Sequence, residues 1–329
     1  MAGPRLPFVL TGATGTGKTA VAIELAERLG GTVFCADARQ IYRGLDIATG
    51  KPTPEEQARV PHVGFDLLDP REPTSAGLYA RAMGIALGAD ESTGRVPLLV
   101  GGSGLYLRAL HTGLADVPPI PPEVRARVRA RLAAQGPEAL HAELATLDPA
   151  LAARLAPRDG QRIARGLEVA LGTGRPLSAW HESSTGEPPA WFWVALVRPR
   201  EEAQRELAAR ARGFFAAGLV DEVRALLAAG FPADAPAFEA LGYREAIALH
   251  AGTLGLEDAI ALLTRHTVQY AKRQATWLRG EARRVDLSFR EVGSHESPGQ
   301  VAADLAARYA QAAARATEAA PPAGNRVSN

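Results

Sequence analysis

Apolar residues along the chain gather in short runs, and the segments between the runs have helical spacing. The first run, Leu6–Leu10, ends in Thr-Gly, and the next segment carries Val21, Leu25 and Leu29 at intervals of four residues. This spacing places the three side chains on one face of a helix. Three further apolar runs are Thr32–Ala36, Val96–Val100 and Trp191–Val197. Strands separated by helices of ten or more residues predict an α/β fold with a parallel sheet and crossover helices.

The pattern changes between residues 115 and 190, where no convincing strand is found and the segment begins with VPPIPP. An apolar stripe of Val124, Val128 and Leu132 predicts one helix there, and Gly160–Leu171 predicts another. We interpret this segment as a helical insertion domain. After the fourth strand the chain is expected to be helical, over Glu201–Ala217, Leu219–Ala229, Glu239–His250, Glu257–Arg279 and a segment after Val301. The predicted domains are a core in two parts (1–114 and 191–290), the insertion (115–190), and a C-terminal helix with a frayed tail (291–329).

The charge balance excludes a general attraction to polyanions. Lys plus Arg is 37 and Asp plus Glu is 36, so the net charge is +1 and any nucleic-acid site must be local. One cysteine, Cys35, cannot form an internal disulfide, and the first apolar run is too short for a signal or membrane segment. We therefore expect a cytoplasmic protein with no membrane association.

Lysine is rare in this chain. Of the 37 basic residues only Lys18, Lys51 and Lys272 are lysines. A compositional drift from Lys to Arg explains the overall bias, and chance is one explanation for the three positions that keep lysine. The other is a need for a compact ammonium where a planar guanidinium does not fit.

The segment after the first strand matches the phosphate-binding pattern G-x-x-x-x-G-K-[ST] in full, between a strand and a helix. Glycines allow backbone N–H groups to converge, the helix N-terminus favours anions, the lysine adds a mobile cation, and the final hydroxyl can bind Mg²⁺. We therefore expect a P-loop NTPase-like, nucleotide-binding type of core that holds a diphosphate or triphosphate. The predicted diphosphate-binding residues are Gly12, Ala13, Thr14, Gly15, Thr16, Gly17, Lys18 and Thr19, with Thr19 as the candidate Mg²⁺ ligand.

The strand before the second glycine cluster lacks the acidic Mg²⁺ ligand that a phosphate-loop hydrolase usually carries at the end of a neighbouring strand. The strand Val96–Val100 runs into Gly101-Gly-Ser-Gly-Leu-Tyr106 and carries no carboxylate for Mg²⁺. Asp37 is the one acid found at a strand end. Ligands bind at the carboxyl ends of strands in open α/β sheets, so Asp37, Ser103 and the phosphate loop should converge. Asp37 is then a candidate general base, and a helix cap or a solvated turn is the alternative.

Several segments together resemble one family, the tRNA dimethylallyltransferases. They occur in order from Gly12 to Arg279, which is more specific than the phosphate loop alone. The segments are GATGTGKT, DARQIY from Asp37, DIATGKP from Asp46, VPH from Val60, GGSGLY from Gly101, QRIARGLEV from Gln161, GLVDEV from Gly218, ALGYRE from Ala240, and YAKRQATWLR from Tyr270.

The resemblance implies transfer of a dimethylallyl group from dimethylallyl diphosphate to the N6 amine of the adenine on the 3′ side of the tRNA anticodon, with release of diphosphate. It implies Mg²⁺ as cofactor, the tRNA anticodon stem-loop as partner, and a bacterial form without a zinc finger; we also expect a monomer. The implied catalytic residues are Asp37, Thr16 and Arg210. The implied tRNA-binding residues are Asp37, Ala38, Arg39, Gln40, Ser103, Arg125, Gln161, Arg162, Ile163, Ala164 and Lys272.

Some assignments have a plain structural alternative, and two positions depart from the family pattern. Arg125 and Arg162 are either phosphate contacts or solvated helix residues. The chain has Ala38 where the family usually has serine, and Val63 where a second histidine is common. Both departures concern the orientation of the adenine, and neither touches the phosphate loop or Asp37.

Two other function classes compete with this interpretation. A small-molecule kinase with a phosphate loop explains Asp37 and the glycine cluster Gly101–Gly104, but it does not explain the arginine-rich helical insertion. An RNA-binding module without catalysis predicts tRNA binding and no prenylated product.

Overall fold

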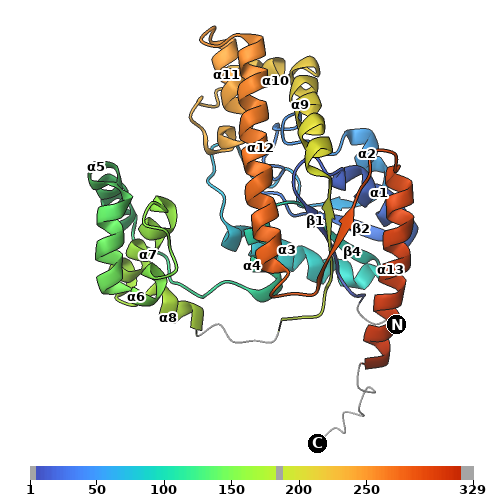
Figure 1. Ribbon diagram of the computed structural model, residues 1–329, viewed down its shortest axis with the longest axis horizontal. Helices are drawn as coiled ribbons and strands as arrows, with labels where there is room; N and C mark the ends of the chain where they lie inside the picture. Colours follow the sequence, from blue (N-terminus) through green and yellow to red (C-terminus); the bar gives the residue numbers. More distant parts are fainter. Residues whose placement is uncertain (1–4, 183–187, 320–329) are drawn as a thin grey trace, which may run out of the picture. The chain divides into compact units, whose positions relative to one another are not determined.

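The computed structural model describes residues 5–182 and 188–319, which form two compact units (Figure 1). One unit contains described residues 5–110 and 189–319, and the other is the segment His111–Pro188. The sequence placed the second unit at 115–190. The predicted tail, residues 320–329, lies outside the described residues.

The larger unit is built on a parallel sheet. Within the described residues it has six strands in the order β3-β2-β4-β1-β5-β6. The strands β1, β2 and β4 are buried along their whole length, which explains their nearly continuous apolar runs. The strands are β1 (Phe8–Gly12), β2 (Gly31–Cys35), β3 (His62–Val63), β4 (Val96–Val100), β5 (Phe192–Val197) and β6 (Leu287–Glu291). The predicted α/β class and parallel sheet are confirmed.

Two strands were not expected. The helices predicted after the fourth strand are observed, but the chain there is not helical throughout, because Leu287–Glu291 pairs with β5 at the edge of the sheet. Leu287 is buried there while Phe289 is exposed, so this strand lacks the buried run of its neighbours. The other, β3, has two residues and gives no pattern to detect.

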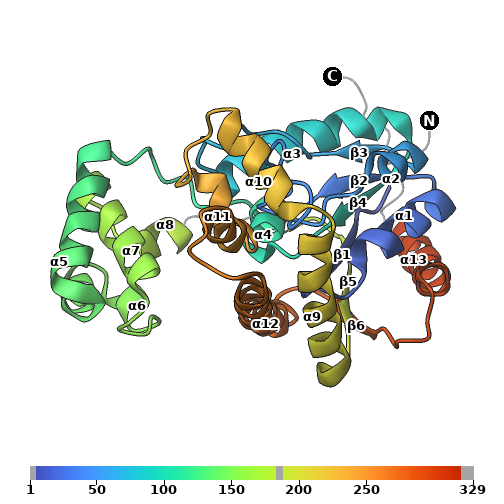
Figure 2. The same cartoon turned by 90° about the horizontal axis from the view of Figure 1, so that it is seen from above.

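Helices cover both faces of the sheet. The side chains of α1 and α13 pack on one face with Phe8 and Leu10, and those of α3, α4 and α10 pack on the other with Val9 and Leu99. Figure 2 shows α13 beside α1. The helices are α1 (Lys18–Leu29), α2 (Pro54–Arg59), α3 (Ala76–Asp90), α4 (Gly104–Thr112), α9 (Arg200–Ala216), α10 (Leu219–Ala228), α11 (Tyr243–His250), α12 (Leu256–Glu281) and α13 (Pro298–Ala319).

The helix predicted over Glu239–His250 begins later than expected, at Tyr243. A short 3₁₀ turn, Pro236–Glu239, precedes it, and Gly242 has a φ of 96° that ends any continuous helix at this point. Among the helices that the structure describes, none is long and apolar enough to cross a membrane.

The second unit is helical throughout its described part. Its helices are α5 (Pro122–Leu147), α6 (Pro149–Ala152), α7 (Gly160–Thr173) and α8 (Leu177–Glu182). The core of this unit contains Val128, Leu144, Ile163 and Leu167, all fully buried. Helix α5 is kinked at Gly136, which has a φ of 80°, so that its two halves pack on α7.

Candidate active site

The phosphate loop joins the carboxyl end of β1 to the start of α1. Gly15 and Gly17 have φ values of 81° and 80°, in the left-handed region that favours glycine. Gly17 is the N-cap of α1, and no side chain caps the helix there. The first amides of α1 are therefore open to an anion, as the sequence motif predicts.

Two side chains of this loop donate to its own backbone. Thr16 Oγ1 donates to the carbonyl oxygen of Ala13 at 2.9 Å, and Lys18 Nζ donates to the same oxygen at 2.8 Å. Thr16 is buried and does not line the cavity described below. Its hydroxyl stabilises the loop, and the catalytic role predicted for Thr16 stays a prediction. Lys18 and Thr19 line the cavity.

Asp37 follows β2, on the loop that faces the phosphate loop. Asp37 Oδ1 accepts a hydrogen bond from Arg39 N at 2.9 Å, which fixes one carboxylate oxygen in a tight turn. Ser103 holds the next residue, because Ala38 N donates to Ser103 Oγ at 2.8 Å and Ser103 N donates to Ala36 O at 3.2 Å. The structure therefore brings Ser103 to the Asp37 loop, as the sequence predicts.

The chain after Asp37 is held by Gln40. Gln40 Nε2 donates to the carbonyl oxygens of Thr49 and Gly50, each at 3.0 Å. Gln40 and Arg39 both line the cavity. Because both of these bonds come from the amide nitrogen of Gln40, the side chain already has a structural task besides the RNA contact predicted for it.

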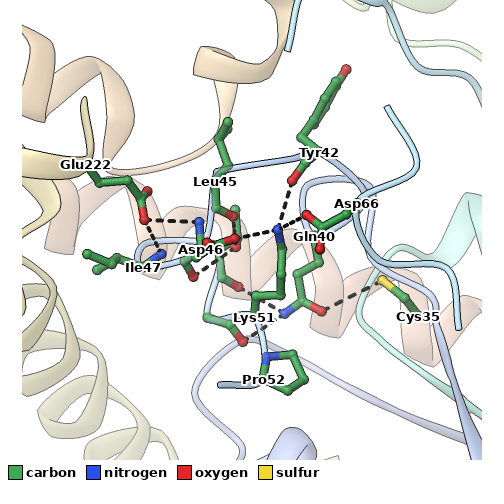
Figure 3. A network of polar contacts seen from close by, with 12 residues as sticks. Cys35, Gln40, Tyr42, Leu45, Asp46, Ile47, Lys51, Pro52, Asp66 and Glu222 are labelled. Atoms are coloured by element: carbon green, nitrogen blue, oxygen red, sulfur yellow. Dashed lines mark hydrogen bonds and ion pairs between the residues drawn. The ribbon is translucent and has the colours of Figure 1, made fainter. Parts of the chain in front are cut away.

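Lys51 lies at the centre of a network of polar contacts that connects Tyr42, Asp46 and Asp66 (Figure 3). Its ammonium donates to Tyr42 O at 2.9 Å, Asp46 Oδ1 at 2.5 Å and Asp66 Oδ1 at 2.6 Å. The side chain of Lys51 is 2 % exposed. Three oxygens around one buried nitrogen match a compact ammonium, which explains why lysine persists at this position.

Replacing Lys51 with arginine is expected to destabilise the fold. The guanidinium is larger and planar, so it cannot reach all three oxygens, and losing hydrogen bonds to a charged group costs about 1–3 kcal/mol. Both carboxylates are half exposed and can be rehydrated, which keeps the cost in this range. The measurement is the free energy of unfolding in urea. Lys272→Arg, the same change at an exposed site, is the control, and a Lys51→Arg variant as stable as the wild type contradicts the argument.

The phosphate loop and the loop that contains Asp37 line a cavity of about 570 Å³. Its charged lining includes Lys18, Asp37, Arg39, Arg210 and Arg273, and an apolar wall is formed by Leu207, Ala211, Phe214 and Leu263. All of these residues belong to the larger unit. The predicted convergence of the phosphate loop with Asp37 is thus observed.

The electrostatics of the cavity favour an anion. Burial lowers the pKa of Lys18 to about 8, and neighbouring Arg210 lowers it further while Asp37 opposes the shift. Burial also lowers the pKa of Arg210, whose guanidinium lies 5.0 Å from the ring centre of Phe214. Within the described residues, Arg210 makes no ion pair or hydrogen bond. Two desolvated cations beside one carboxylate therefore leave the cavity with unbalanced positive charge.

The described residues contain no cluster of three or more His, Cys, Asp or Glu side chains able to hold a metal ion. Thr19 lines the cavity beside Lys18, and within the described part of the chain its hydroxyl has no hydrogen bond. Mg²⁺ is commonly held by one or two protein oxygens together with substrate phosphates. Thr19 therefore fits a magnesium ion that arrives with a diphosphate.

Helix α12 supplies site residues that the sequence analysis missed. Thr267, Tyr270, Arg273 and Gln274 line the cavity, whereas the predicted contact Lys272 is exposed and does not. The missed signal is Gln274, a polar residue at helical spacing from the apolar Leu263 and Leu278. Burial raises the pKa of Tyr270 to about 12, so its hydroxyl remains protonated.

The helical unit carries the remaining predicted contacts. Arg125, Gln161 and Arg162 are exposed, as a contact requires. Ile163 is fully buried and Ala164 is nearly so, and both pack in the core of this unit. Helical periodicity turns these two side chains inward while their neighbours face outward, and the tRNA contact predicted for this stretch stays a prediction.

Comparison with known proteins supplies an independent line of argument. A family model described as IPP transferase matches residues 40–281, and one described as isopentenyl transferase matches residues 7–64. A tRNA dimethylallyltransferase of Thermomicrobium roseum is 47 % identical over 84 % of both chains, and one of Geobacter metallireducens is 44 % identical over 85 % of this chain and 92 % of its own. A solved tRNA isopentenylpyrophosphate transferase of Bacillus halodurans is 30 % identical, with a TM-score of 0.66, covering 95 % of this chain and 99 % of the other.

Proposed function

The chain belongs to the tRNA dimethylallyltransferase family, and from this premise we propose that it transfers a dimethylallyl group from dimethylallyl diphosphate to the N6 amine of the adenine 3′ of the tRNA anticodon. One observation carries the proposal: a phosphate loop and a carboxylate, Asp37, face each other across one cavity. Such a pair can bind a diphosphate and deprotonate an acceptor without hydrolysing a nucleotide.

The donor side stabilises a leaving group. The C1–O bond of the donor breaks and negative charge grows on the diphosphate. The phosphate loop, Lys18 and Arg210 line the same cavity, and we propose that the loop amides and these two cations neutralise that charge. When bound, Mg²⁺ supplies further neutralisation of the phosphate oxygens, with Thr19 as its protein ligand. Leu207, Ala211 and Phe214 offer an apolar wall for the prenyl chain.

The acceptor side removes a proton. The adenine N6 is a weak nucleophile because its lone pair is delocalised into the ring. The nitrogen gains positive charge as it forms its bond to C1, so it must lose one proton to give the neutral product. The Asp37 carboxylate accepts that proton, and diphosphate departs with the electrons of the C1–O bond. An anticodon-loop base is stacked on its neighbours, so it must leave the stack before it enters the cavity.

The wider assignments belong to the same proposal. We propose that the anticodon stem-loop is bound with the help of the helical unit, and that the protein acts as a cytoplasmic monomer. Exposed Arg125 and Arg162 support the first point, because arginine is suited to phosphate contacts.

Replacing Arg125 and Arg162 together with alanine is expected to weaken stem-loop binding and its salt dependence. Each lost phosphate contact lowers the slope of log K against log[salt] by about 0.7–0.9. The measurement is stem-loop affinity between low and moderate salt, with donor binding expected to stay unchanged. Arg315→Ala, at an exposed position of α13, is the control. Unchanged affinity and slope in the double variant contradict the assignment.

The kinase alternative is separated from the transferase by one experiment. The protein is incubated with unmodified tRNA and either γ-labelled ATP or dimethylallyl diphosphate labelled in its allyl group. The proposal predicts that label from the allyl group enters tRNA and that phosphate label does not. Transfer of phosphate label, or tRNA binding without any prenyl product, contradicts it.

A further inference from the structure

One side chain on α12 joins two loops of the active site. Gln274 Oε1 accepts a hydrogen bond from Thr14 N at 2.9 Å, and Gln274 Nε2 donates one to Gly102 O at 3.1 Å. Thr14 belongs to the phosphate loop, and Gly102 belongs to the loop that follows β4. Gln274 is buried, so water cannot readily take the place of a lost partner. Breaking either hydrogen bond would leave a buried polar group unsatisfied.

The loop after β4 is tightly packed against Gln274 at Gly102 and against Ala36 at Gly101. A Cβ added at Gly102 would overlap the amide nitrogen of Gln274, and one added at Gly101 would overlap the carbonyl group of Ala36. The loop after β4 is therefore held between α12 and the end of β2. This explains the two adjacent glycines, because only their missing side chains allow both approaches.

The connection continues to the proposed base. From Gly102 the chain passes to Ser103, whose amide donates to Ala36 O and whose hydroxyl accepts from Ala38 N. These bonds flank Asp37 on both sides. An unbroken set of contacts thus runs from the phosphate loop through Gln274 to the Asp37 loop.

We propose that Gln274 is a positioning residue that sets the distance between the bound diphosphate and Asp37. The inference rests on the proposed function. Transfer requires C1 of the donor and N6 of adenine to be about 3–3.5 Å apart, and a misplacement of about 1 Å costs about 100-fold in rate. A carboxamide fits the position because it accepts from one loop and donates to the other.

The first part of the test uses two substitutions at Gln274 and compares their effects on kcat and on KM. Gln274→Met keeps the length of the side chain and removes both hydrogen bonds. It is expected to lower kcat by about 10–100-fold with little change in KM for the stem-loop. Gln274→Glu can accept from Thr14 N but, when ionised, cannot donate to Gly102 O, and its charge repels the diphosphate. It is expected to raise the donor KM and to lower kcat. The value of kcat relative to wild type should recover as the pH falls, because the new carboxyl then gains a proton that it can donate to Gly102 O.

A third variant moves Gln274 without changing it. In Gly102→Ala the added methyl displaces the carboxamide, so the loss of kcat should resemble that of Gln274→Met. The double variant should be no worse than either single one, because both remove the same connection. Gln311→Glu, the same substitution on the exposed surface of α13, is the control.

Three outcomes overturn the inference: wild-type kcat in Gln274→Met, a pH profile of Gln274→Glu parallel to that of wild type, or additive losses in the double variant. These outcomes are distinct from failure of the proposed function, in which the wild-type protein itself forms no prenylated adenosine. Thermal unfolding of each variant confirms that the comparison is made between folded proteins.

Discussion

Replacing Asp37 with asparagine is expected to lower kcat by about 10²–10⁴-fold, the usual loss when a general base is removed. Asparagine has nearly the same shape, and its side-chain oxygen can still accept the hydrogen bond from Arg39 N. Donor binding should be unchanged or tighter, because a negative charge near Lys18 and Arg210 is removed. The measurements are single-turnover formation of prenylated adenosine and the Kd for dimethylallyl diphosphate.

Asp234→Asn provides the matched control, since Asp234 is exposed on the same unit and does not line the cavity. It should have wild-type turnover. If Asp37→Asn also turns over at a near-normal rate, Asp37 is not the base, and the hydrogen bond that it accepts would be its whole role.

Lys18→Met is expected to lower kcat by about 10²–10³-fold, the typical effect of losing one preorganised donor to developing negative charge. It should also weaken donor binding, because Lys18 is one of the two desolvated cations in the cavity. Binding of the stem-loop alone should change little. Single-turnover rates and the donor Kd measure the effect, and wild-type values for both would exclude Lys18 from the site.

The same prediction has a pH signature. Because the pKa of Lys18 in the free protein is about 8, the amine is charged below this pH and loses its charge above it. The value of kcat/KM for the donor reports ionisations of the free enzyme, so it should fall above about pH 8. Lys18→Met should lack this limb. A wild-type profile that stays flat to high pH contradicts the assignment.

The sheet and its two facing loops could be predicted because both depend on local sequence. The buried strands are continuous apolar runs, the phosphate loop is defined by spacing, and the rule for strand ends places Asp37 opposite that loop. The few positions that keep lysine were also informative in two cases, because the ammonium groups of Lys18 and Lys51 each donate to buried or half-buried oxygens. Lys272 is exposed, and the tRNA contact predicted for it stays a prediction.

The missed features depend on tertiary structure. Gln274 acquires its role because α12 crosses two loops that lie far from it in sequence, and no local pattern encodes that contact. The edge strand β6 is half exposed and therefore lacks a buried run. The resemblance names the consecutive residues Gln161–Ala164, whereas the helix exposes the side chains of only part of this stretch.

The most direct test of the account is a crystal structure of the protein with an anticodon stem-loop and an unreactive thio analogue of dimethylallyl diphosphate. The account predicts the diphosphate on the amides between Gly15 and Thr19, with Lys18 and Arg210 against it. It also predicts an Asp37 carboxylate oxygen within about 2.6–3.2 Å of the N6 amine of an unstacked adenine. A diphosphate bound elsewhere, or an Asp37 side chain turned away from the amine, would contradict it.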